Sequence, residues 1–303
     1  MFRIIAIVVF LSALVCAGCI SGLSSKATGD EIDIAAVSGP DYREQGTVAY
    51  ESQEAKLTSS TGCEVLYTYL RPVESSRNVL VVFGHGFMRS KERMAQLARH
   101  LASWGIPVVN VEFCNSKWWV GNHDLNGADM VAVARKLNAA RGLYTGFSAG
   151  GLAALTAAAN DVQTIALFGL DLVDNKILGK KLVPELAVPF FGLIAAASIC
   201  NADRNGLKIY NAISDSKVIE VEDATHCHFE FPFDAKCSLV CGKGEKRFKR
   251  EIIQKAILGF TTAFLLWQSG IDARGEAWWS EGSDEIKILT QAGYIKILKP
   301  QSK

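Results

Sequence analysis

Ser148 is the residue whose surroundings most clearly predict chemistry. It lies in segment 146–150, which reads Gly-Phe-Ser-Ala-Gly, between strand-like residues 143–147 and helix-like residues 152–159. A strand that turns at once into a helix pivots on one strained residue, and flanking glycines let backbone pack where a Cβ would clash. The Ser148 hydroxyl would then stand at a sheet edge, near the positive end of a helix dipole. This context favours a nucleophile that attacks a carbonyl over an ordinary glycine-rich turn.

A serine hydroxyl is a weak nucleophile until a base accepts its proton, and histidine is the usual base because its pKa lies near neutrality. Of the five histidines, only His226 and His228 follow Ser148 in the chain. Both come after the β-rich segment 217–221. We expect His226, the first to leave that segment, to be the base, and His228 to be a supporting or surface residue. The alternative is that His226 is an ordinary core or surface histidine.

An acid must orient the imidazole and stabilise its protonated form. We expect Asp171, which follows the strand-like segment 163–168, to be this acid. Asp174 is a nearby alternative, and Asp203 or Asp215 would serve if the acid followed the next strand instead. Apart from these roles, an aspartate in such a place often caps a turn.

The transition state of carbonyl attack carries an oxyanion, which backbone N–H groups must stabilise. The Ala149 N–H, directly after the nucleophile, is one expected donor. The Phe87 N–H is the other, because Phe87 follows the apolar segment 78–83 through Gly84-His85-Gly86. We interpret His85 as a structural residue of this turn.

These side chains require several strands with a shared edge. Strand-like and helix-like segments alternate through the middle of the chain, a pattern that predicts an α/β fold with a mostly parallel sheet and helices on both faces. Ligands of such sheets lie at the carboxyl ends of the strands, where Ser148, Asp171 and the turn at Phe87 all fall. The expected strands are 63–70, 78–83, 106–113, 143–147, 163–168, 188–197 and 217–221, and the expected helices are 90–104, 126–137, 152–159 and 245–268.

The composition is that of a folded chain. Its 303 residues are 49% hydrophobic and 21% charged, and the net charge of +1 gives no electrostatic case for nucleic acid. The N-terminus has Arg3 and then a short apolar run that ends in small residues, which is typical of a secretory signal. We expect residues 1–19 to be this signal, 20–60 a polar tether and extension, and 61–303 the folded domain.

The end of the leader resembles a bacterial lipobox, which implies lipidation of Cys19 and attachment to a membrane. Cleavage after Ala17 and a retained anchor helix are the alternatives. Lipidation of Cys19 and cleavage after Ala17 both predict an exported protein, at the cell envelope or secreted. The paired tryptophans Trp118-Trp119 and Trp278-Trp279 could serve a membrane surface but more often pack inside a protein.

Together these motifs resemble the α/β-hydrolase superfamily. Its most similar branch holds chlorophyllases, platelet-activating-factor acetylhydrolases and cutinase-like polyester hydrolases, and the segment 169–174 is similar to the chlorophyllase Gly-Leu-Asp-Pro-Val motif. The resemblance spans about residues 63–268, implies the α/β-hydrolase fold and supports Asp171 as the acid. Phe147 and Leu172 depart from that branch, where histidine and proline are common. We expect neither to touch a catalytic group.

Six cysteines follow the leader, and an even number in an exported protein favours disulfides. Cys200, in the loop after strand 188–197, and Cys227, beside His226, suggest one pair. Cys63–Cys114 and Cys237–Cys241 are then the expected remaining pairs. The spacing of Cys237 and Cys241 gives a weaker case for a metal site, because no second close pair completes four ligands.

The sequence therefore predicts an exported serine hydrolase that cleaves a small ester or lipid-like substrate through an acyl-enzyme, with no metal or organic cofactor. A catalytically inactive binding protein on the same scaffold is the alternative. Residues 174–189 are the candidate lid. Acyl length, alcohol group and oligomeric state are not set by these motifs.

Overall fold

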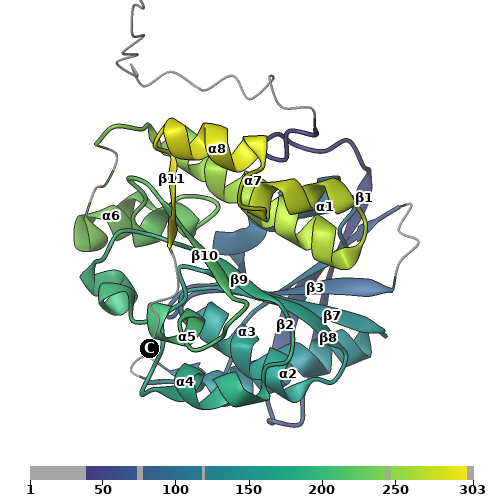
Figure 1. Ribbon diagram of the computed structural model, residues 1–303. Helices are drawn as coiled ribbons and strands as arrows, with labels where there is room; N and C mark the ends of the chain where they lie inside the picture. The colour runs from purple at the N-terminus through teal and green to yellow at the C-terminus, as the bar shows by residue number, and fades with distance from the viewer. Residues whose placement is uncertain (1–38, 74–77, 118–119, 243, 245, 299–303) are drawn as a thin grey trace, which may run out of the picture.

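The computed structural model describes residues 39–73, 78–117, 120–242, 244 and 246–298 (Figure 1). The expected signal at 1–19, the candidate lipidation site Cys19 and the pair Trp118-Trp119 lie outside the described residues. Nearly all of the segment expected to be the folded domain is described.

A nine-stranded sheet forms the centre of the fold, in the order β1-β2-β4-β3-β7-β8-β9-β10-β11. The strands β3, β4, β7, β8, β9 and β10 run parallel, whereas β1, β2 and β11 join through antiparallel pairings. The prediction of an α/β fold with a mostly parallel sheet is confirmed. The strands are β1 (Tyr50–Thr58), β2 (Glu64–Pro72), β3 (Val79–Gly84), β4 (Val108–Val111), β7 (Arg141–Phe147), β8 (Thr164–Leu170), β9 (Phe190–Ile194), β10 (Lys217–Val221) and β11 (Ile295–Leu298).

Helices cover both faces of this sheet (Figure 1). The α-helices are α1 (Ala95–Ser103), α2 (His123–Lys136), α3 (Ala149–Asn160), α4 (Leu178–Leu182), α5 (Leu207–Tyr210), α6 (Ala235–Cys241), α7 (Arg250–Ser269) and α8 (Asp284–Gln291). Short 3-10 turns are η2 (Lys91–Met94), η3 (Val183–Glu185), η4 (Ile199–Arg204), η5 (His226–Phe229) and η6 (Ala273–Trp279), and β5 (Ser116–Lys117) pairs with β6 (Val120–Gly121) as a separate ribbon.

The alternating direction of side chains along the central strands explains why the protein has two hydrophobic cores, one on each face of the sheet. Val81 and Phe83 of β3 join a core with α1, α7 and α8, whereas Leu80 and Val82 join a core with α2, α3 and α5. Successive side chains of a strand point to opposite faces, so a strand between two helical layers is apolar throughout. All six residues of β3 are accordingly buried.

Both margins of the sheet differ from the sequence-based expectation. β1 lies inside the segment 20–60 that was expected to be a polar tether and extension, and β11 lies after residue 268, where no strand was expected. Trp278 and Trp279 are buried in the core beside α7, so they are packing residues.

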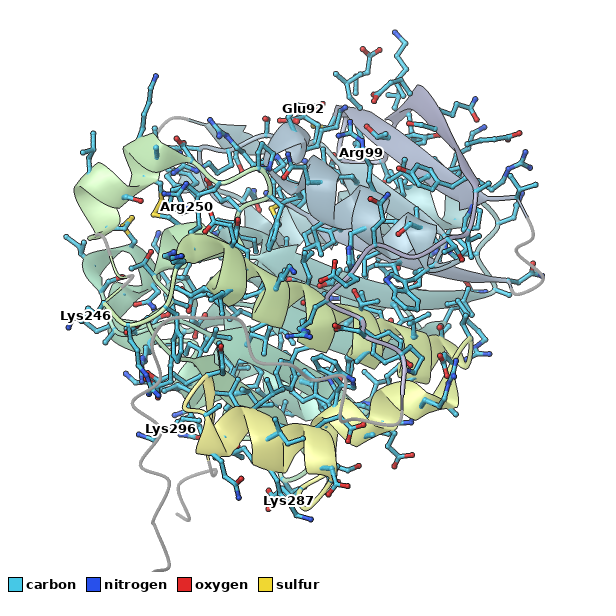
Figure 2. All side chains as sticks on the ribbon, turned by 90° about the horizontal axis from the view of Figure 1, so that it is seen from above. Glu92, Arg99, Lys246, Arg250, Lys287 and Lys296 are labelled. Atoms are coloured by element: carbon cyan, nitrogen blue, oxygen red, sulfur yellow. A yellow bond between two sulfur atoms is a disulfide. The ribbon has the colours of Figure 1, made fainter. Side chains whose placement is uncertain are left out.

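Among the described residues, no helix has both the length and the apolar character needed to span a membrane. Figure 2 shows charged side chains such as Glu92, Lys246 and Lys287 on different sides of the surface.

Candidate active site

The turn at Ser148 has the strained geometry that the sequence predicts. β7 ends at Phe147, α3 begins at Ala149, and Ser148 between them has φ 56° and ψ −121°, which is unfavourable for a residue with a Cβ. A Cβ on Gly146 would collide with the backbone of Gly150, and one on Gly150 with the carbonyls of Gly84 and His85. The two glycines thus allow the turn to pack tightly, which fixes the position of the serine hydroxyl.

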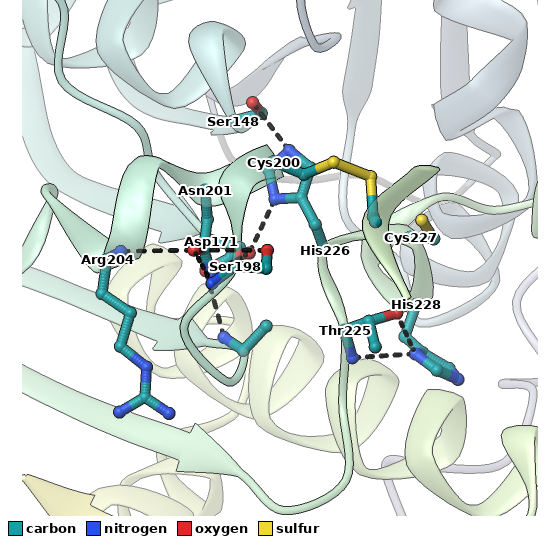
Figure 3. A network of polar contacts seen from close by, with 12 residues as sticks. Ser148, Asp171, Ser198, Cys200, Asn201, Arg204, Thr225, His226, Cys227 and His228 are labelled. Carbon is teal, nitrogen blue, oxygen red and sulfur yellow. Dashed lines mark hydrogen bonds and ion pairs between the residues drawn. A yellow bond between two sulfur atoms is a disulfide. The ribbon is translucent and has the colours of Figure 1, made fainter. Parts of the chain in front are cut away.

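Ser148, His226 and Asp171 form a continuous hydrogen-bonded chain (Figure 3). The His226 Nε2 lies 3.0 Å from the Ser148 Oγ, and the His226 Nδ1 lies 2.7 Å from the Asp171 Oδ2. A carboxylate only accepts hydrogen bonds, so Nδ1 carries the proton and Nε2 is free to accept the serine proton. All three residues are buried. The structure therefore brings together the three side chains that sequence reasoning selected.

Asp171 is held by further donors. The Ala195 N–H donates to Oδ1 at 3.0 Å, and the Asn201 Nδ2 lies 3.3 Å from Oδ1 and 3.2 Å from Oδ2. Asn201 also donates to the Ala196 carbonyl at 2.9 Å, which fixes its amide group. Sequence reasoning missed Asn201, although its place beside Cys200 and after an expected strand was a usable signal. Asn201 thus supports the Asp171 carboxylate directly, and Figure 3 shows it next to Asp171.

The alternative acids have other partners. The Asp174 Oδ1 accepts the Gly179 N–H at 2.8 Å at the start of α4. Asp203 has left-handed backbone in η4, and Asp215 lines a hollow at the amino ends of β9 and β10. The second late histidine, His228, accepts the Thr225 N–H through Nδ1 at 3.0 Å, so it supports the turn that carries His226.

The turn after β3 lies at the same pocket as Ser148. Gly86, Phe87 and Ser148 all line it, and within the described residues neither the Phe87 nor the Ala149 N–H has a protein acceptor. His85 braces this turn, because its Nε2 accepts the Phe113 N–H at 3.0 Å and its Nδ1 donates to the Gly86 carbonyl at 2.8 Å. This geometry agrees with the structural role expected for His85.

One expectation about the departures from the family pattern is wrong. The Phe147 ring lies 4.5 Å from the His226 ring, centroid to centroid, at an interplanar angle of 39°. Phe147 directly precedes the pivot residue of the turn, and this position places its ring against the imidazole. Leu172 instead packs near Gly151 and Gly206, away from the hydrogen-bonded chain.

A pocket of about 430 Å³ opens at Ser148 and His226. Its other walls come from the turn after β3 and from α6, which contributes Lys236, Cys237, Val240 and Cys241. The candidate lid 174–189 forms α4 and η3 and supplies none of the lining residues. The expected lid position is therefore wrong for this pocket. A larger hollow of about 780 Å³ lies at the opposite ends of the strands.

The disulfides confirm one expected pair and correct two. Cys63 bonds to Cys114 as expected, but Cys200 bonds to Cys241 and Cys227 bonds to Cys237. Cys237 and Cys241 lie one turn apart on the same face of α6. Cys237 bonds to the loop that carries Cys227, whereas Cys241 bonds to the loop that carries Cys200. Sulfurs of Cys227, Cys237 and Cys241 lie within 4.8 Å of one another, yet all are engaged in disulfides and are not free thiolate ligands.

An ion pair joins the turn after β3 to the segment after His226. The Arg89 Nε donates to the Glu230 Oε1 at 2.5 Å, and the Glu230 side chain is fully buried. Burial raises the pKa of the Glu230 carboxyl above its ordinary value, although Arg89 opposes this shift. Sequence reasoning did not identify the pair, because its members lie far apart in the chain.

The arrangement as a whole can carry out nucleophilic catalysis. It supplies a hydroxyl, an imidazole that can take its proton, a buried carboxylate that orients the imidazole, and backbone donors at the same pocket. No protein-family model matches the chain, and no curated protein is significantly similar to it in sequence.

Proposed function

We propose that this protein is a serine hydrolase of the α/β-hydrolase type that cleaves carboxylic esters through an acyl-enzyme. The observation that carries the proposal is the hydrogen-bonded chain from Ser148 through His226 to Asp171. The strained strand-to-helix turn at the serine and the chain order serine, aspartate, histidine both support this fold type.

In the proposed reaction, the Ser148 Oγ attacks the ester carbonyl while the His226 Nε2 takes its proton. The Phe87 and Ala149 N–H groups stabilise the oxyanion, and each such donor contributes about 3–4 kcal/mol to the barrier reduction. Asp171 stabilises the imidazolium, which then protonates the leaving alcohol. Water, activated by His226, attacks the acyl-enzyme and releases the acid and the free serine.

The test is turnover of short-chain p-nitrophenyl esters, together with labelling by a fluorophosphonate probe. We expect labelling at Ser148 and loss of both signals in Ser148→Ala. His226→Ala should lose turnover, whereas His100→Ala, at a buried histidine of α1 that contacts the Tyr42 carbonyl and none of the catalytic groups, serves as its matched control and should keep most of it. A folded wild-type protein with neither turnover nor labelling would favour the inactive binding protein.

We also propose that the protein is exported. Three disulfides in the described residues are compatible with an oxidising compartment. Attachment to a membrane through a lipid on Cys19 belongs to this proposal. Metabolic labelling with an alkyne fatty acid should mark the wild type and not Cys19→Ser; equal labelling of both would exclude lipidation at that cysteine.

A further inference from the structure

One wall of the catalytic pocket is a helix with little packing of its own. Of the seven residues of α6, only Cys237 is buried, whereas Leu239 is 81% exposed and Val240 is 73% exposed. Isolated helices of this length are unstable in water, and helices in proteins are stabilised mainly by burying an apolar face. Figure 1 shows α6 at the edge of the molecule, apart from the helices that cover the sheet.

Covalent bonds take the place of that packing. Cys237 joins α6 to Cys227, directly after His226, and Cys241 joins it to Cys200, directly before Asn201. At the N-terminal end of α6, Asp234 caps the Lys236 N–H at 3.0 Å and lies 3.3 Å from the guanidinium of Arg93. The two disulfides thus fix α6 to the loops that carry the base and support the acid.

Large apolar side chains stand exposed at this pocket. Phe87 is 37% exposed and Met88 is 61% exposed, and both line the pocket together with Val240. An apolar group that covers them removes apolar surface from water, which is favourable by about 25 cal/mol per Å². The pocket volume of about 430 Å³ lies within the usual range of small-molecule sites.

We propose that α6 is a disulfide-held cap and that Val240 on it, with Phe87 and Met88, selects esters whose acyl or alcohol group is apolar. This inference rests on the proposed esterase function. With both bridges formed, Val240 completes an apolar wall beside Ser148. Without them, α6 separates from the pocket, and longer apolar groups lose the contact that favours them over acetate.

The first experiment compares kcat/KM for p-nitrophenyl hexanoate and p-nitrophenyl acetate. We expect Val240→Ala to lower the hexanoate-to-acetate ratio by about 3- to 10-fold, since part of one apolar side chain is removed. Leu239→Ala is the matched control, because Leu239 is also largely exposed on the same helix but does not line the pocket. Equal ratios in wild type and both variants would overturn the proposal.

The second experiment removes both bridges of α6 at once, in one variant that combines Cys200→Ala and Cys241→Ala with Cys227→Ala and Cys237→Ala. We expect faster amide hydrogen exchange in 235–241 and a lower hexanoate-to-acetate ratio, while the control Cys63→Ala/Cys114→Ala changes neither. Unchanged exchange in α6 would show that packing holds the cap and would overturn its covalent role.

A third measurement separates this proposal from the esterase proposal. 2-Octanone carries an alkyl chain like that of the hexanoate ester but cannot be hydrolysed, and its binding to the intact protein can be followed by calorimetry. Weaker binding to Val240→Ala than to Leu239→Ala supports the apolar wall even if no ester is turned over. Identical binding to both variants would contradict it, whatever the activity of the wild type.

Discussion

Replacing Asn201 with alanine is expected to lower kcat/KM for ester hydrolysis while the protein stays folded. The Asn201 amide donates to both oxygens of the buried Asp171 carboxylate, and that carboxylate orients His226. Loss of the amide leaves Asp171 with the Ala195 N–H and His226 as partners. The Asp171 carboxylate is therefore held less firmly in place, but it keeps two hydrogen-bond partners.

The magnitude follows from the bond lengths. A hydrogen bond to a charged group contributes about 1.5–3 kcal/mol. The two Asn201 contacts, at 3.3 and 3.2 Å, are long, so the lower end of that range applies. A loss of about 1.5–2 kcal/mol in the transition state corresponds to roughly a 10- to 30-fold decrease in kcat/KM.

The assay is steady-state hydrolysis of p-nitrophenyl butyrate, with the melting temperature measured in parallel. Asn205→Ala is the matched control, because Asn205 makes a comparable pair of hydrogen bonds to the Asp174 backbone, both at 2.8 Å, but none to the catalytic groups. We expect it to change kcat/KM by less than about twofold. Asn201→Asp keeps the acceptor for the Ser198 N–H but places a like charge beside Asp171, so it should lose more activity than Asn201→Ala.

Two results would refute this reasoning. One is an Asn201→Ala variant whose kcat/KM stays within about twofold of wild type at a similar melting temperature. The other is an Asn205→Ala variant that loses as much activity, because the effect would then come from the loop as a whole.

Three further predictions concern stability. Cys63→Ala/Cys114→Ala opens a loop with a sequence separation of 51 and should lower the free energy of unfolding by about 4 kcal/mol in denaturant titrations, with ester turnover retained at temperatures where it folds. Within the described residues the Tyr210 hydroxyl has no hydrogen-bond partner, so Tyr210→Phe should keep or raise stability by up to about 1 kcal/mol; a large loss would point to a hidden partner. Burial raises the pKa of Glu230 above its ordinary 4.5 despite Arg89, so the native state binds this proton more tightly than the unfolded state, and stability falls as the pH rises from 4.5 through the native pKa. Glu230→Gln should therefore lose less melting temperature than wild type as the pH rises above 4.5, and an equal loss would contradict the assignment.

The position of each catalytic candidate could be predicted because each follows a strand closely in the chain. Ser148 follows β7, Asp171 follows β8, and His226 comes shortly after β10. Parallel strands bring their carboxyl ends to one edge, so three local patterns were enough to place three distant side chains together. The apolar run of β3 likewise predicted a central strand, because a strand covered on both faces has no polar side.

The supports of the site could not be predicted in the same way. The pair Arg89–Glu230 forms through the tertiary fold, and no periodicity or motif marks it. For Asn201 the sequence offers only its place beside Cys200 and after an expected strand, which does not show that it contacts Asp171. The same holds for the disulfides, since spacing alone does not tell which loops α6 will meet. Cys237 and Cys241 are close in sequence, but a helix directs both toward neighbouring loops.

The outer strand β1 was missed because its residues do not alternate as those of a half-buried strand should. Most of β1 is exposed, and its sequence alone resembles a polar loop. Its strand character becomes clear only from its pairing with β2 along its whole length. The polar composition of β1 therefore reflects an outer strand rather than a tether.

The composition of β1 has a consequence for self-association. Among the described residues, no strand pairs with the outer side of this nine-residue strand, and such an edge offers backbone groups to which a strand of another molecule could add, as in fibril growth. Glu51, Glu54 and Lys56 project along this strand, and each forms an ion pair with a side chain of the same molecule. A second copy would have to desolvate these charges before its backbone could bond, which opposes polymerisation at this margin of the sheet.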